Sequence, residues 1–122
     1  MKQALPNQLE FEVGETAGYV CVRVQGEGEA QGARRLEAAL NELISKGQIH
    51  LILDLRDIRF LDPVSCEAIK SAMERAEEEG GCIVVVDQSL PLERALKLLG
   101  LDKLAHVVPT ISQATRYLTA HC

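Results

Sequence analysis

The sequence predicts an α/β protein with a mixed, mostly parallel sheet of about five strands and about four helices, in the order ββαβαβαβα. Three observations support this. Helical patterns alternate with short apolar runs along most of the chain, which predicts right-handed crossovers and parallel strands. The run 49–55 is almost continuously apolar, as expected for a central strand covered on both faces. Two alternating segments with glycines between them open the chain, which favours an antiparallel hairpin.

The first half of the chain begins with that hairpin. Apolar and polar residues alternate over 9–13 and 20–24, and the glycine-containing stretch 14–18 predicts the turn. A helix follows, because five apolar residues fall on one helical face and a glycine suits its C-terminal cap: Ala33, Leu36, Leu40, Leu43, Ile44 and Gly47. The central strand 49–55 then leads into a predicted loop through 59–61.

A second helix is predicted to start after this loop. Asp62 suits the N-cap position, and Pro63 suits the first helical position, where its missing N–H is not needed. The buried stripe of this helix is Ala68, Ile69, Ala72, Met73 and Ala76. We expect Gly80-Gly81 to end it.

The last third of the chain predicts two further strands and two further helices. The strands are expected at 82–86 and 106–108. Between them, a third helix is expected to bury Leu92, Ala95, Leu96 and Leu99 and to end at Gly100. The spacing of Thr110 and Gln113 is that of a capping box, which predicts the start of a final helix that buries Ala114 and Leu118.

Length and composition limit the possible functions. The 122 residues fit a single domain, 1–122, with a core at about 9–118. Hydrophobic residues make up 47% and charged residues 25%, an ordinary globular balance. The formal charge of −5, with no basic patch, argues against nucleic acid and against anionic membranes as partners. The sequence shows no apolar run long enough to span a membrane and no secretory signal. We therefore expect no direct membrane insertion, and we expect a cytoplasmic location.

The residues that most often carry chemistry are scattered. Four cysteines without a CxxC pair and three dispersed histidines predict no metal site and no redox motif, and all four cysteines are expected to be reduced thiols: Cys21, Cys66, Cys82 and Cys122. Asp54, Asp57 and Asp62 are more readily explained as local hydrogen-bonding residues than as a magnesium site. Neither a phosphate-binding glycine motif nor a G-x-S-x-G elbow is present. We therefore expect no catalytic residues and no cofactor.

Four stretches, in this order and spacing, resemble the STAS family over roughly residues 9–118. They are Val24-Gln25-Gly26, Leu53-Asp54-Leu55 followed by Phe60-Leu61-Asp62, the segment 98–104, and Pro109-Thr110 with Ala114. The resemblance implies the STAS fold in a single domain. It also implies a non-enzymatic module of bacterial signalling, most similar to an anti-sigma-factor antagonist. Such a module binds an anti-sigma factor of ATP-binding kinase fold in partner switching, a form of transcription regulation, and that kinase can phosphorylate it.

On this resemblance the partner-binding surface lies at the start of the second helix and comprises Asp62, Pro63, Val64, Ser65, Cys66 and Ile69. Regulated family members read Asp-Ser-Ser/Thr-Gly-Leu there, and the second hydroxyl residue accepts the phosphate. In this chain Val64 stands at the acceptor position and Ser65 replaces the glycine. Ser65 is thus a possible displaced phosphosite. One helical position turns a side chain by about 100°, however, so a kinase aligned on the usual acceptor position is expected to miss it.

Several alternatives stay open from the sequence. Asp62 is either a helix cap alone or also a partner contact, and Cys66 is a packed or partner-facing thiol or, at a helix start, a reactive one. A STAS accessory subunit of a membrane lipid transporter, or a signalling scaffold, is the alternative function. An aspartate-phosphorylated receiver domain is disfavoured, because the chain opens with a hairpin and Pro109-Thr110 follows its last strand. The oligomeric state is open, a homodimer included.

Overall fold

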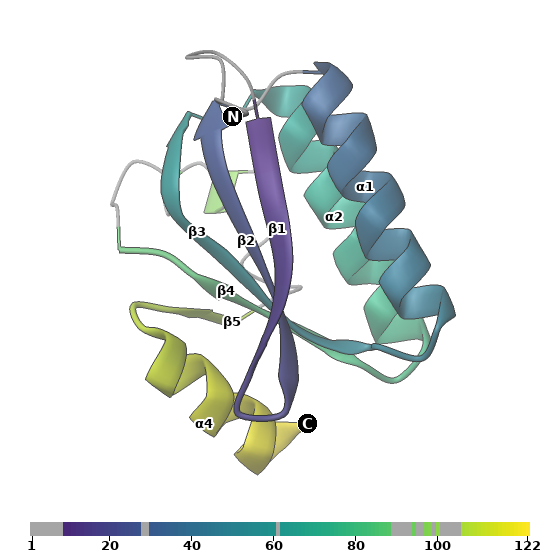
Figure 1. Cartoon of the computed structure of the whole chain (residues 1–122), viewed down its shortest axis with the longest axis vertical. Coiled ribbons are helices and arrows are strands. Elements are labelled where there is room, and N and C mark those ends of the chain that lie inside the picture. Colours follow the sequence, from purple (N-terminus) through teal and green to yellow (C-terminus); the bar gives the residue numbers. More distant parts are fainter. Residues whose placement is uncertain are drawn as a thin grey trace.

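The computed structural model of the chain describes residues 9–27, 30–60, 62–88, 94, 97–98, 100 and 106–122. These form one five-stranded sheet of order β1-β2-β3-β4-β5, in which only the β1–β2 pair is antiparallel (Figure 1). The strands are β1 (Leu9–Thr16), β2 (Tyr19–Glu27), β3 (His50–Phe60), β4 (Cys82–Val86) and β5 (His106–Val108). The helices are α1 (Ala30–Ser45), α2 (Pro63–Glu78) and α4 (Ile111–His121). The predicted mixed, mostly parallel α/β architecture is confirmed.

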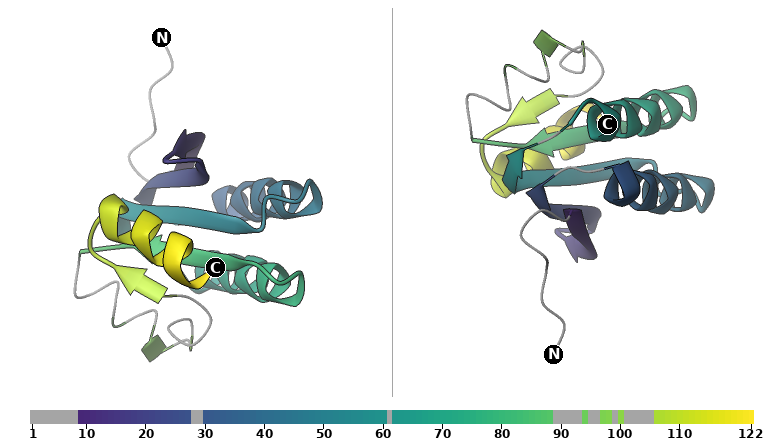
Figure 2. Two further views of the ribbon diagram at one scale, coloured as in Figure 1. Left: turned by 90° about the horizontal axis from the view of Figure 1, so that it is seen from below. Right: turned by 90° about the horizontal axis from the view of Figure 1, so that it is seen from above.

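The helices form a layer on each side of the sheet. α1 and α2 lie side by side on one face, and α4 covers the other (Figures 1 and 2). The position of β3 between the two helical layers explains why its apolar run is nearly continuous. Leu51, Leu53 and Leu55 belong to the core under α1 and α2, whereas Ile52 belongs to the core under α4. Alternate side chains of one strand therefore enter two separate cores.

The predicted buried stripes agree with the structure. Ala33, Leu36, Leu40 and Ile44 of α1 are buried, and so are all five residues of the stripe predicted for α2. Gly47 ends α1 with a φ of 89°, a left-handed conformation that glycine adopts without steric cost. In α4, Ala114 and Leu118 are buried, and the Thr110 hydroxyl accepts a hydrogen bond from the Gln113 N–H at 3.1 Å.

Two boundaries differ from the sequence-based prediction. The hairpin turn is only Ala17-Gly18, with φ values of 51° and 85°, so Gly14 lies inside β1 opposite Cys21 and not in the turn. β3 continues to Phe60, through residues predicted as a loop, because β2 runs beside it through two register shifts. Pairing between strands, which has no local sequence signal, extends both elements. The helix expected around 92–99 lies largely outside the described residues.

The prediction of four reduced thiols is wrong for two of them. Cys82, the first residue of β4, forms a disulfide with Cys122 at the end of α4, 40 residues away, and their Cα atoms are 6.4 Å apart. The spacing carries no motif, because the pair is brought together only when α4 lies across the sheet. Cys21 and Cys66 are free thiols, as predicted. None of the helices in the described ranges combines the length and the apolar character that crossing a bilayer requires.

Candidate functional site

The start of α2 is built as its sequence predicts. The Asp62 side chain accepts a hydrogen bond from the Ser65 N–H at 2.9 Å, and the Asp62 carbonyl accepts one from the Cys66 N–H at 3.1 Å. Pro63 occupies the first helical turn. A cap of this kind stabilises a helix by about 1 kcal/mol, and it fixes the direction in which the following side chains point.

The predicted site residues divide into an outer and an inner set. Pro63 is exposed, Asp62 is half-buried, and Val64 keeps 47% of its surface exposed. Ser65 and Ile69 are fully buried, and Cys66 is 3% exposed. Only the outer set, Asp62, Pro63 and Val64, offers surface to another molecule.

The inner set lies on the buried stripe of α2. Residues 65, 66, 69, 72, 73 and 76 follow one another at helical spacing, and all are buried. Cys66 and Ile69 belong to the core under α1 and α2. Burial raises the pKa of the Cys66 thiol, and the nearby carboxylates of Asp62 and Glu67 raise it further. A raised pKa disfavours the thiolate, which supports the packed and not the reactive interpretation of Cys66.

The Ser65 hydroxyl is enclosed. Its Oγ has no hydrogen-bond partner among the described residues, and the side chain has no exposed surface. A buried hydroxyl without a partner is destabilising by itself, so its place in the core follows from the helical phase and not from a hydrogen bond. In this conformation a protein kinase has no access to Ser65 Oγ.

Val64 borders a groove between α1 and α2. The groove has a volume of about 350 Å³; Arg34 and Glu37 line it from α1, and Glu67 and Ser71 from α2. An exposed apolar side chain therefore lies beside charged groups of both signs. This combination, an apolar centre with a polar rim, is typical of protein-binding surfaces. Sequence reasoning identified Val64 but missed the groove, because its α1 wall is 30 residues away along the chain.

The acidic residues of β3 form ion pairs and not a cation site. Asp57 accepts hydrogen bonds from Arg23 Nε at 2.9 Å and Nη2 at 2.6 Å, and the 3%-exposed Asp54 accepts two from the Arg56 side chain at 2.9 Å each. Burial raises the pKa of Asp54, but the hydrogen bonds and charge of Arg56 outweigh burial, so its pKa lies below the usual value. Within the described ranges, no three His, Cys, Asp or Glu side chains form a group able to hold a metal.

The fold is that of the small α/β domains built like SpoIIAA. The crystal structure of an anti-sigma factor antagonist from Mycobacterium paratuberculosis superposes with a TM-score of 0.83 at 26% identity, covering 96% of this chain and 99% of that one. SpoIIAA in its unphosphorylated form superposes with a TM-score of 0.74, covering 93% and 100%; at 14% identity it shows the fold alone.

Sequence comparison gives the family. The STAS domain model matches residues 10–114, so the chain belongs to the STAS domain family. It is 27% identical over 97 residues to the anti-sigma F factor antagonist of Paenibacillus polymyxa, covering 79% of this chain and 83% of that protein. It is 26% identical over 109 residues to the anti-sigma-F factor antagonist RsfB of Mycobacterium tuberculosis, covering 89% and 88%.

Proposed function

We propose that this STAS domain is an anti-sigma-factor antagonist that binds an anti-sigma factor of ATP-binding kinase fold through the start of α2 and is not phosphorylated there. The names of its relatives support the general role. The main observation in support of this binding surface is the 47% exposure of Val64. This large apolar side chain lies beside the α1–α2 groove, two residues after the Asp62 cap.

The six predicted residues would divide their roles. Asp62, Pro63 and Val64 contact the partner, whereas Ser65, Cys66 and Ile69 hold the helix start in place from within the core. Desolvation of Val64 in a partner's pocket is worth up to about 1.5 to 3 kcal/mol for full burial, less the part that is already buried. The surrounding charges then determine which partner fits.

Two features support the absence of phosphorylation. Val64, at the acceptor position of the family, has no hydroxyl group. Ser65, the neighbouring hydroxyl, is fully buried. A phosphate on Ser65 Oγ would place about two negative charges inside the core, which the fold opposes strongly. We therefore propose that phosphorylation at the start of α2 does not regulate binding by this domain, so that binding is constitutive in this respect.

The test uses the purified ATP-binding anti-sigma protein of the source organism, with ATP present. The wild-type domain is expected to bind, and Val64→Glu is expected to weaken binding about tenfold or more, because it places a charge in an apolar contact. Ala120→Glu, which adds the same charge to an exposed position on α4, is the matched control and should bind normally. Binding is measured by titration calorimetry.

A second arm tests phosphorylation by mass spectrometry. Val64→Ser is expected to gain one phosphate, while the wild type and Ser65→Ala stay unmodified. Phosphate on Ser65 of the wild type would refute the constitutive part of the proposal. No binding by the wild type would refute the antagonist role and favour the accessory-subunit alternative.

A further inference from the structure

A second surface lies on β1, at the edge of the sheet. Among the described strands, β1 pairs with β2 alone. Their ladder starts from the pair Thr16 and Tyr19 next to the two-residue turn and runs without a register shift to Leu9. Hydrogen-bonded and non-hydrogen-bonded pairs alternate along such a ladder, so Phe11, Val13 and Glu15 turn their N–H and C=O groups to the open side.

α1 closes only the beginning of this edge. The carbonyl of Leu9, which also points outward, accepts a hydrogen bond from Arg35 Nη2 at 3.1 Å. Within the described residues, no group contributes a hydrogen bond to the outward backbone groups of Phe11, Val13 or Glu15. Those three residues form an unpaired strand edge of the kind to which another strand can be added.

The side chains of β1 give this edge a charge and a shape. Glu10, Glu12 and Glu15 are its only charged residues. Glu12 lies opposite Arg23, but Arg23 is paired with Asp57, and none of the three glutamates forms an ion pair within the described residues. Val13 lies opposite Val22 on the α1 face and keeps 51% of its surface exposed. Glu10 and Glu12 thus make the α4 face of the edge acidic, whereas on the α1 face the exposed Val13 is followed by Glu15.

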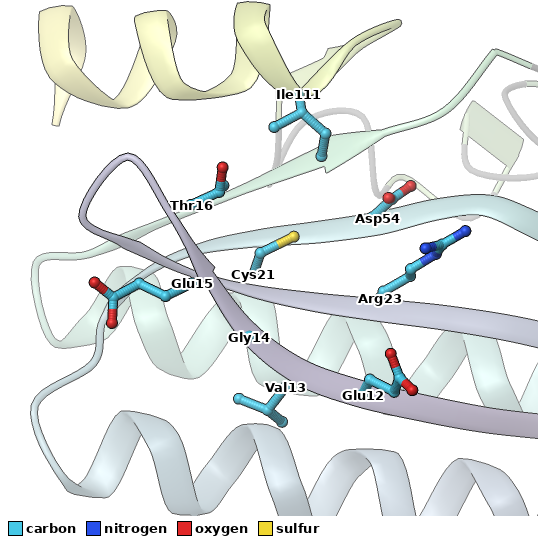
Figure 3. Close-up of a pocket in the computed structure, with 9 residues that line it drawn as sticks. All are labelled: Glu12, Val13, Gly14, Glu15, Thr16, Cys21, Arg23, Asp54 and Ile111. Carbon is cyan, nitrogen blue, oxygen red and sulfur yellow. The ribbon is translucent and has the colours of Figure 1, made fainter.

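A pocket of about 270 Å³ opens beside this edge, on the face that α4 covers (Figure 3). Cys21 and Asp54 form part of its floor, Glu12 stands at its side, and Ile111 of α4 points down into it. Gly14 borders the pocket, and a Cβ added there would meet nothing within 4 Å. A side chain entering across Gly14 from an added strand would therefore find open space.

We propose that β1 accepts an extended basic segment of a partner protein as an additional strand. Basic side chains of the segment would face Glu10 and Glu12, and the one opposite Gly14 would enter the pocket. Its alternate apolar side chains would cover Val13. A second copy of this chain fits poorly, because every charge on β1 is acidic and a second β1 would bring no basic side chain to pair with Glu10 and Glu12.

The probes are two synthetic octapeptides, one alternating Lys and Val and one alternating Glu and Val, titrated into the full chain by calorimetry. The Lys–Val peptide is expected to bind, and its affinity should fall as added salt screens the charges. The Glu–Val peptide is not expected to bind. In the double variant Glu10→Lys/Glu12→Lys the preference should reverse, with Lys–Val binding falling on the order of tenfold, because opposite-charge cross-strand pairs become like-charge pairs. Equal binding of both peptides, or an unchanged preference in this variant, would overturn the proposal.

Backbone pairing has its own readout. Bound Lys–Val peptide should slow amide hydrogen exchange at Phe11, Val13 and Glu15, whose N–H groups point outward. Val13→Pro removes one outward donor without breaking the β1–β2 ladder and should weaken binding about tenfold, while Val13→Thr, which keeps the donor, should not. Slowed exchange of the outward amides on raising the protein concentration alone would identify a second copy as the occupant and overturn the proposal. None of these outcomes depends on Val64 or on an anti-sigma factor.

Discussion

Removing the disulfide between Cys82 and Cys122 should reveal how far it stabilises the domain. The bond joins residues 40 apart in the sequence. In the chain-entropy description, a cross-link over about 40 residues removes roughly 13 cal/mol/K from the unfolded ensemble, or about 4 kcal/mol at 25 °C. For a domain with a urea m-value of about 2 kcal/mol/M, this corresponds to a midpoint shift of about 2 M.

The assay is urea unfolding of the wild type and of Cys82→Ser/Cys122→Ser, each with and without a thiol reductant. The reductant should lower the wild-type midpoint to that of the double variant and leave the double variant unchanged. Cys21→Ser, at a free thiol, is the control and should respond to reductant as the wild type does. A wild-type midpoint that does not change with reductant, together with four alkylatable thiols, would refute the reasoning.

Three further outcomes are expected. Asp54→Asn should lower the free energy of unfolding by about 1 to 3 kcal/mol near pH 7, because it weakens the buried interaction with Arg56. Since the pKa of Asp54 is depressed in the folded protein, the difference in stability between the variant and the wild type should shrink as the pH falls below about 4. Urea unfolding at several pH values measures this difference. Ile69→Ala should lower the free energy of unfolding by about 2 to 5 kcal/mol while the folded fraction still binds the partner, as parallel unfolding and binding titrations would show. Gly81→Ala should lower the melting temperature, because the new Cβ would collide with the Ile49 backbone; an unchanged melting curve would contradict this close approach.

The candidate site was only partly predictable. Asp62 and Pro63 carry a local helix-start signal, so the sequence places the start of α2 correctly. The burial of Ser65 could have been predicted from the sequence, because Ser65 lies four residues before Ile69 and so falls on the same helical face as the predicted stripe. The groove beside Val64 was not, since one of its walls belongs to α1 and is set by how the two helices lie against each other.

Among the described residues, the sequence by itself determined the order of the elements, the caps of α2 and α4 and most of the core, because these depend on local periodicity and on helix-end chemistry. The tertiary structure alone decided which residues from distant segments meet. It paired Cys82 with Cys122, extended β3 along β2, and left β1 as an acidic edge beside a pocket. Such contacts leave no local pattern, because they follow from the pairing of strands and from the packing of the helices against the sheet.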